Sequence, residues 1–294
     1  MQELESEMPI NPLIETDALA ELLGQPHVCI IDASWYLPPT TRDAFAEFQA
    51  RHIPGAAFFD IDAISDTQSS LPHMLPSAEF FAQKVSEMGI DNQSLVIVYD
   101  GHGMMSAPRV WWMFRFFGHE QVAVLNGGLP KWEREARALE AGMPKAIPAI
   151  FTPKPNPSLL ADWENIQHGI LQKKASSQVL DMRSAGRFNG SEPEPRAGLR
   201  SGHIPGSLNL PWTSLIHPEE KTLLSAATLK ARFEDCGLNL EDVTICSCGS
   251  GITACVGLLA LSVLGNDKAS VYDGSWAEWG SRNDLPIESA LSTI

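Results

Sequence analysis

The chain has 294 residues, of which 44% are hydrophobic and 19% are charged, and its formal net charge is −15. This length favours two domains, each with enough apolar residues to bury a core of its own. So strong a negative charge excludes nucleic acid and anionic membrane surfaces as main partners. A small anionic substrate stays compatible with it, because a local pair of arginines overrides a distant field.

Cysteine usage and the N-terminus bear on cellular location. The chain has five cysteines, an odd number, and four of them lie in its second half. This does not resemble the disulfide framework of a small secreted protein and indicates a reducing compartment. The first seven residues include three glutamates and no basic residue, unlike a signal or transit peptide. The longest apolar run, residues 252–264, is too short to span a bilayer. We therefore expect a soluble cytoplasmic protein without a membrane partner.

Short apolar runs alternate with helical patterns along the chain. Patterns typical of buried strands occur at residues 28–32, 95–99, 179–181 and 243–247, and helical patterns at 44–51, 78–88, 110–117 and 252–264. Strands that alternate with helices predict an α/β fold with a mainly parallel sheet flanked by helices. The aromatic residues of 110–117 go round the helix, which predicts core and interdomain packing.

The same landmarks occur twice, in the same order. The tetrapeptide His-Ile-Pro-Gly stands at residues 52–55 and again at 203–206, and corresponding landmarks are separated by 147 to 151 residues. Two domain-sized copies indicate a tandem pair of domains and not a solenoid. Because the histidine of the tetrapeptide is present in both copies, we expect it to have a structural role.

A proline-rich stretch, residues 146–157, separates the copies. Prolines at this density oppose helix and sheet and favour an extended linker. The predicted domains are therefore residues 1–145 and 158–294.

The most informative stretch begins at Cys248, which follows the apolar run 243–247 and precedes Gly249, Ser250 and Gly251. Glycines let the backbone turn so that several N–H groups point inward, and the start of the next helix adds its positive dipole end. Such a loop stabilises a thiolate, so Cys248 is predicted to be a nucleophile held by backbone amides. The alternative is a small buried cysteine, which does not need this loop.

The two copies differ at this position. Where the second copy has Cys248, the first has Asp100. A carboxylate cannot accept sulfur as a thiolate does, so one active site per chain is expected and the first domain is predicted to be catalytically inactive.

The other cysteines, Cys29, Cys236, Cys246 and Cys255, are expected to be buried structural residues. For Cys246, the alternative is a regulatory disulfide with Cys248. Metal binding lacks a second cluster of ligands.

Residues 48–56 and 269–279 resemble two signatures of the rhodanese family of sulfurtransferases, and the resemblance covers nearly the whole chain. Thiosulfate-preferring members carry basic residues directly after the cysteine. The loop after Cys248 is uncharged and resembles that of the 3-mercaptopyruvate sulfurtransferases of the family. Cysteine phosphatases of similar architecture need an arginine six residues after the cysteine, where this chain has Ala254. The resemblance implies two tandem rhodanese-like domains. A thiosulfate sulfurtransferase and a non-enzymatic persulfide carrier remain as alternatives.

The resemblance also implies a reaction. Cys248 takes sulfur from 3-mercaptopyruvate, releases pyruvate and becomes a persulfide, which passes its outer sulfur to cyanide or to a thiol acceptor such as thioredoxin. Neither a metal nor a cofactor is implied. The loop residues expected to contact the substrate are Gly249, Gly251, Ile252 and Thr253.

Two arginines match the substrate-binding positions of the family. They are Arg187 and Arg196, in a loop rich in glycine and proline. A guanidinium group fits a carboxylate through two parallel hydrogen bonds, which suits this role. The alternative is that both are solvated and paired with Glu192 and Glu194.

The resemblance places a proton relay in Ser250, His73 and Asp62. Serine alone is a weak acid or base, so a histidine oriented by a carboxylate is the expected partner. Asp60 competes with Asp62 for this role. The alternative for His73 is a loop histidine that is hydrogen-bonded to backbone.

Overall fold

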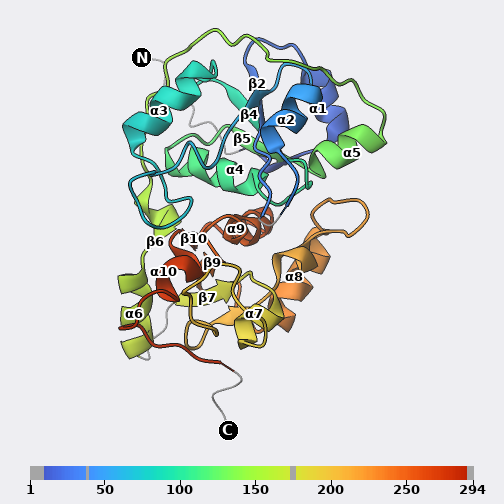
Figure 1. Ribbon diagram of the computed structural model, residues 1–294. Helices are drawn as coiled ribbons and strands as arrows, with labels where there is room; N and C mark the ends of the chain where they lie inside the picture. The colour runs from blue at the N-terminus through green and yellow to red at the C-terminus, as the bar shows by residue number, and fades with distance from the viewer. Residues whose placement is uncertain (1–9, 38–39, 173–176, 290–294) are drawn as a thin grey trace, which may run out of the picture.

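The computed structural model describes residues 10–37, 40–172 and 177–289, which form two α/β domains, one above the other in Figure 1. The first domain contains a five-stranded sheet in the order β1-β5-β4-β2-β3. In that order the strands are Leu13–Ile14, Val122–Leu125, Leu95–Tyr99, Val28–Asp32 and Ala57–Phe58.

The second domain repeats this topology. Its sheet has the order β6-β10-β9-β7-β8, and the strands in that order are Leu160–Ala161, Ala269–Tyr272, Val243–Ser247, Ser177–Asp181 and Leu208–Asn209. Each pairing among the described strands is parallel. The predicted α/β fold, with two tandem domains that each contain a parallel sheet, is confirmed. Parallel strands end at the same edge of a sheet, so the segments that follow β4 and β9 emerge where a reactive site is expected.

Helices cover both faces of the first sheet. On one face, α1 (Thr16–Leu22), α2 (Ala44–Ala50) and α5 (Gly128–Arg134) share a single apolar cluster. On the other face lie α3 (Ala78–Glu87) and α4 (Ala107–Phe116), which belong to a second and larger cluster.

The second sheet is covered in the same way. Its outer face packs against α6 and α10, whereas α8 and α9 join the large cluster. The helices of this domain are η1 (Pro157–Leu159), α6 (Trp163–Gln172), α7 (Ala185–Asn189), η2 (Trp212–Leu215), α8 (Ala226–Asp235), α9 (Ala254–Val263) and α10 (Ser275–Trp279). Among the described ranges, no helix is long and apolar enough to cross a lipid bilayer.

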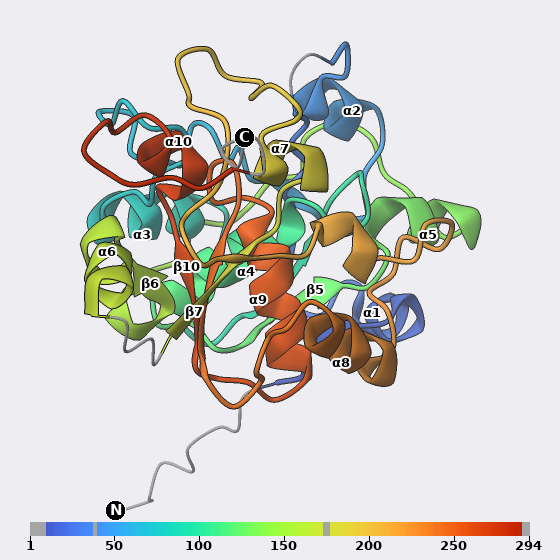
Figure 2. The ribbon, with the colours of Figure 1, turned by 90° about the horizontal axis from the view of Figure 1, so that it is seen from below.

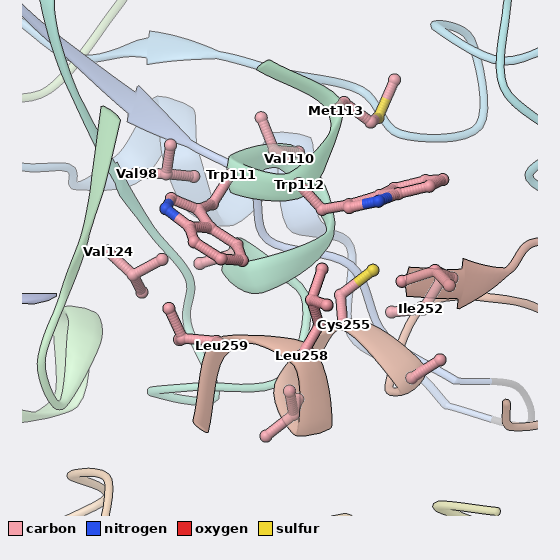
Figure 3. Packing of buried hydrophobic residues seen from close by; sticks show 14 of the residues in the cluster. Val98, Val110, Trp111, Trp112, Met113, Val124, Ile252, Cys255, Leu258 and Leu259 are labelled. Carbon is pink, nitrogen blue, oxygen red and sulfur yellow. The ribbon is translucent and has the colours of Figure 1, made fainter. Parts of the chain in front are cut away.

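The two domains meet through α4 and α9, which lie against each other at the centre of the molecule (Figures 1 and 2). Trp111 and Trp112 of α4 face Cys255, Leu258 and Leu259 of α9 (Figure 3). Each large apolar side chain buried in this way contributes about 1.5–3 kcal/mol. The predicted role of the aromatic helix in core and interdomain packing is confirmed.

Two helices begin at other residues than the sequence pattern predicts. α4 begins at Ala107 instead of residue 110, because Pro108 fits the first turn of a helix, where its missing N–H is not needed. α9 begins at Ala254 instead of residue 252, because Ile252 and Thr253 remain part of the loop after Cys248.

The proline-rich stretch 146–157 is held against the first domain. Ala149 N donates to Ser86 O at 2.9 Å, and Lys154 N donates to Phe117 O at 2.8 Å. The side chain of Phe151 is buried in the large cluster. The stretch is therefore extended, as predicted, but it is attached along its length and not a free spacer.

A buried carboxylate lies at the carboxyl end of β2. Asp32 accepts hydrogen bonds from Ser34 N at 2.9 Å and Ser34 Oγ at 2.5 Å. Burial, which disfavours the charged form, raises the pKa of Asp32 to about 6. In the second domain the corresponding Asp181 is instead paired with Arg183, whose Nη2 lies 2.6 Å from Asp181 Oδ2.

This difference makes a prediction about stability and pH. The carboxyl group titrates near pH 3.9 in the unfolded chain, so the folded chain binds the extra proton between about pH 4 and pH 6. Its contribution to stability is therefore present below about pH 4 and is lost as the pH rises through 6. We expect Asp32→Asn to gain about 3 kcal/mol relative to the native chain between pH 4 and pH 7, measured by urea unfolding. Equal pH dependence of the two proteins would contradict this assignment.

Candidate active site

The loop that carries Cys248 is fixed by the start of α10. Ser275 Oγ accepts hydrogen bonds from Cys248 N at 3.1 Å and Gly251 N at 3.2 Å. Trp276 N donates to Cys248 O at 3.0 Å. Gly251 has a φ of 79°, in the left-handed region that glycine adopts without strain. The loop is therefore held in one curled conformation between β9 and α9.

A cavity of about 250 Å³ opens above this loop, and both domains line it. The first domain contributes Trp35, Leu37 and Met105. The second contributes Met182, Arg183, Ser184, Arg187, Pro195, Arg196, Trp212, Cys248, Gly249, Ser250, Ile252 and Thr253. The predicted loop residues other than Gly251 and both predicted arginines thus meet in one cavity. Gly251 does not line the cavity, and a Cβ added to it would lie 2.7 Å from Asp273 Oδ1.

Arg187 is held over the loop by a buried carboxylate. Its Nη2 lies 2.6 Å from Glu194 Oε2, and Glu194 also accepts from Arg183 Nη1 at 2.7 Å. An added Cβ on Gly249 would be 2.9 Å from Arg187 Nη2, so the guanidinium rests on the loop backbone. The expected alternative pairing with Glu194 is present, but it orients Arg187 toward the cavity. Glu192 instead accepts from Ser184 Oγ.

Arg196 is half-buried beside the sulfur. Burial lowers the pKa of Arg196, and the electrostatic interaction with Cys248 is the largest opposing effect. Its Nη2 lies 3.4 Å from His73 Nε2. Arg196 therefore links the cavity to the predicted relay.

His73 comes from the first domain, and Asp62 accompanies it. His73 Nδ1 lies 2.9 Å from Asp62 Oδ1, and Trp35 Nε1 donates to Asp62 Oδ2 at 3.1 Å. The contact with His73 lowers the pKa of Asp62 and keeps this carboxylate ionised. Asp60 instead accepts from the backbone of its own turn. The structure thus brings Asp62, and not Asp60, against His73, while Ser250 takes its place separately in the cavity wall.

Sequence reasoning missed a buried ion pair between the domains. Arg109 Nη1 on α4 lies 2.5 Å from Asp273 Oδ1, and both side chains are almost fully buried. Arg109 Nη1 also lies 3.4 Å from Gly251 O, and Arg109 Nη2 donates to His73 O. The available signal was an arginine near the start of a mostly apolar helix, since a buried arginine requires a partner.

His52 and His203 have structural surroundings, and among the other cysteines Cys246 and Cys255 are buried as expected, whereas Cys29 and Cys236 are only partly buried. His52 Nδ1 lies 2.8 Å from Phe48 O, and His203 Nδ1 lies 2.8 Å from Phe188 O, each with its ring stacked on that phenylalanine. These contacts agree with the structural role expected in both copies. Burial raises the pKa of the Cys246 thiol to about 12, which makes it a poor nucleophile.

The loop of the first domain encloses its own anion. Asp100 is fully buried, and its carboxylate accepts hydrogen bonds from five backbone amides at 2.7–2.9 Å. The donors are His102, Gly103, Met105, Ser106 and Ala107. In the corresponding turn of the second domain, the amides of Cys248 and Gly251 donate to Ser275 Oγ and Cys248 itself lines the cavity, so the comparison supports one active site per chain.

This arrangement makes a prediction about the first domain. Asp100→Ala leaves five buried amides without their acceptor, at about 1–3 kcal/mol each before water or relaxation compensates. We expect a loss of at least about 3 kcal/mol in the free energy of unfolding. The kcat of the folded variant should stay native, because Asp100 does not line the cavity. The control is Asp43→Ala, which removes one exposed helix cap and costs about 1 kcal/mol. Equal losses in the two variants would contradict the prediction.

Residues 15–135 and 167–282 each match the rhodanese-like domain. The chain belongs to the rhodanese family. It is 44% identical over 276 residues to the 3-mercaptopyruvate sulfurtransferase of Escherichia coli (strain K12), which covers 94% of this chain and 97% of the relative. It is 43% identical over 287 residues to the thiosulfate sulfurtransferase of Rattus norvegicus, which covers 95% of both. The crystal structure of SseA from Escherichia coli, described as a 3-mercaptopyruvate sulfotransferase with the rhodanese fold, superposes with a TM-score of 0.83. That structure is 41% identical and covers 91% of this chain and 99% of its own.

The two rhodanese relatives bear the names of different sulfur donors, yet their identities to this chain are nearly equal. Overall identity therefore does not separate the two donors. The charges of the cavity and its loop have to decide between them.

Proposed function

We propose that this rhodanese-family enzyme transfers sulfur from 3-mercaptopyruvate to a thiol or cyanide, with Cys248 as the carrier. The observation that carries the proposal is the cavity above Cys248, with an uncharged loop at its base and two arginines at its side. The position of the thiolate favours nucleophilic attack, and the arginines favour a small carboxylate substrate.

The charge around the cavity favours a monoanion. Three arginines line it, and among the described residues Asp181 and Glu194 are paired with two of them. Within the part of the chain that the structure describes, Arg196 is the lining arginine without a carboxylate ion pair, and it can pair with the single carboxylate of mercaptopyruvate. A thiosulfate dianion would bring one charge more, and the loop after Cys248 has no side chain to balance it.

The first step breaks the carbon–sulfur bond of the substrate. The Cys248 thiolate attacks the substrate sulfur, and the electron pair of the C–S bond leaves with the carbon as the enolate of pyruvate. The proton of the substrate thiol then moves to that carbon. The products are pyruvate and a Cys248 persulfide anion, whose charge the loop amides stabilise.

The proton transfer needs a group that can accept and return a proton. His73 is oriented by Asp62 and lies next to Arg196, at the edge of the substrate site. Ser250, in the loop itself, would pass a proton between His73 and the substrate in this proposal. In the second step a thiol or cyanide attacks the outer sulfur and returns Cys248 to its thiolate.

The proposal also covers the sulfur acceptor and the cellular location. A protein thiol such as thioredoxin is one candidate acceptor, since the cavity opens to the surface beside Leu37, a half-exposed apolar residue. The five cysteines are all free, which suits a cytoplasmic enzyme. The family resemblance leaves thiosulfate sulfurtransferase and persulfide carrier as the competing functions.

The substrate assignment predicts a preference between donors. With cyanide as acceptor, we expect kcat/KM for 3-mercaptopyruvate to exceed that for thiosulfate by about tenfold or more, which corresponds to roughly 1.4 kcal/mol in transition-state binding. A preference for thiosulfate would overturn the substrate assignment and leave the sulfur carrier in place. Turnover of neither donor would favour the persulfide carrier.

The proposed substrate-binding role of Arg187 and Arg196 predicts that their removal lowers kcat/KM. Removing a hydrogen bond to a charged group costs about 1.5–3 kcal/mol, so Arg187→Ala and Arg196→Ala should each lower kcat/KM for mercaptopyruvate by about 10- to 150-fold. The matched control is Arg282→Ala, an exposed arginine paired with Asp284, which should leave the kinetics native. Unchanged kinetics in both cavity variants would refute the binding role.

A further inference from the structure

The buried ion pair between the domains touches both halves of the site. Arg109 Nη1 contacts Asp273 and the carbonyl oxygen of Gly251, and Arg109 Nη2 donates to the carbonyl oxygen of His73. The other oxygen of Asp273 accepts from Leu75 N at 2.7 Å. One guanidinium group therefore holds the backbone of the sulfur loop and the backbone of the relay histidine at a fixed separation.

The contact with Gly251 fixes the direction of a loop amide. Gly251 O accepts from Arg109 on one side and from Cys255 Sγ at 3.3 Å on the other. In a planar trans peptide, the C=O of one residue and the N–H of the next point in opposite directions. Holding Gly251 O toward the interior thus turns the N–H of Ile252 away from Arg109, on the cavity side of the loop. That amide belongs to the group that can stabilise a sulfur anion on Cys248.

The contact with His73 supports an unusual backbone conformation. His73 has a φ of 61°, in the left-handed region that costs a non-glycine residue on the order of 1 kcal/mol. This conformation lets its carbonyl oxygen reach Arg109 while its ring reaches Asp62 and Arg196. The backbone hydrogen bond to Arg109 and the ring contacts with Asp62 and Arg196 thus occur together in this conformation of His73.

The chain also contains an uncharged counterpart of this interdomain contact. In the reverse direction, a loop of the second domain lies over the first, and Leu223 N donates to Asn126 Oδ1 at 2.9 Å. Asn126 corresponds in sequence to Asp273, and Lys221, with a φ of 59°, corresponds to His73. The positions of α9 that correspond to Arg109 are uncharged; they are Val256 and Gly257. Domain docking alone therefore does not need the ion pair, which occurs where the sulfur chemistry takes place.

We propose that Arg109, through Asp273, is a positioning residue that sets the sulfur loop and His73 in their reactive arrangement without touching the substrate. The cavity-lining residues among those described do not include Arg109. The inference rests on the sulfur-transfer function proposed above. It assigns to the first domain a second contribution besides His73.

The test is a variant that removes both charges of the ion pair and keeps the interdomain hydrogen bond from Leu75 N. In Arg109→Met/Asp273→Asn, the asparagine can still accept from Leu75 N, as Asn126 accepts from Leu223 N. Replacing a buried pair as a whole avoids the penalty of leaving one charge unpaired. We expect a near-native melting temperature, an unchanged KM and a kcat lowered by about 10- to 100-fold, since small misplacements of reacting groups have effects of this size.

A second readout does not depend on the donor. The rate of Cys248 alkylation by iodoacetamide, followed by mass spectrometry at a fixed pH, should fall in the double variant as the loop amides lose their alignment. If the native enzyme turns over neither donor, the proposed function fails, and this rate still tests the positioning role. A double variant with native melting temperature, kcat and alkylation rate would show that the pair is only structural.

Two further variants complete the test. Arg109→Lys keeps the charge, but a single ammonium group cannot reproduce the planar fork to Asp273, Gly251 and His73, so kcat should fall in a folded protein. A native kcat in this variant would also overturn the proposal, even if the double variant does not fold. The control is Arg134→Met, which removes an exposed interdomain pair with Glu220 and should change neither readout.

Discussion

A guanidinium group buried between two domains sets the geometry on which the site depends. Removing the Arg109 cation and the Asp273 carboxylate from water costs several kcal/mol for each ion, and only a well-matched set of partners repays it. The partners here are the backbone carbonyls of Gly251 and His73, together with Leu75 N on the carboxylate. The penalty for an unpaired buried charge favours the arrangement in which these groups surround the guanidinium, and the reactive groups depend on that arrangement.

The two copies of the domain contribute different residues to the site. The copy with Cys248 has the cysteine in the wall of the cavity, and the copy with Asp100 fills the equivalent turn with its own carboxylate. Helix α4 of the same copy carries Arg109 into the interface. The first domain also supplies His73 and Asp62. The copy that has Asp100 thus contributes residues to the site of the copy that has Cys248.

The sequence predicts those parts of the molecule that depend on local patterns. Strands β2 and β4 have the predicted bounds, because continuous β-branched runs are typical of buried parallel strands. The Cys248 loop could be found because its chemistry lies within a few residues. The ion pair joins Arg109 and Asp273, which are 164 residues apart, and its existence depends on how the domains dock. The role of Glu194 in holding Arg187 was likewise hidden, since the sequence does not distinguish a solvated pair from a buried one.

The central claim is that Cys248 alone carries sulfur between donor and acceptor, and mass spectrometry tests it most directly. The enzyme is treated with a small excess of 3-mercaptopyruvate without an acceptor, digested under conditions that preserve persulfides, and assayed for pyruvate. We expect one added sulfur atom per chain, on Cys248, an equal amount of pyruvate, and no added sulfur in Cys248→Ser. Sulfur on Cys246 or Cys255, or on the serine variant, or release of pyruvate without any protein-bound sulfur, would contradict the account.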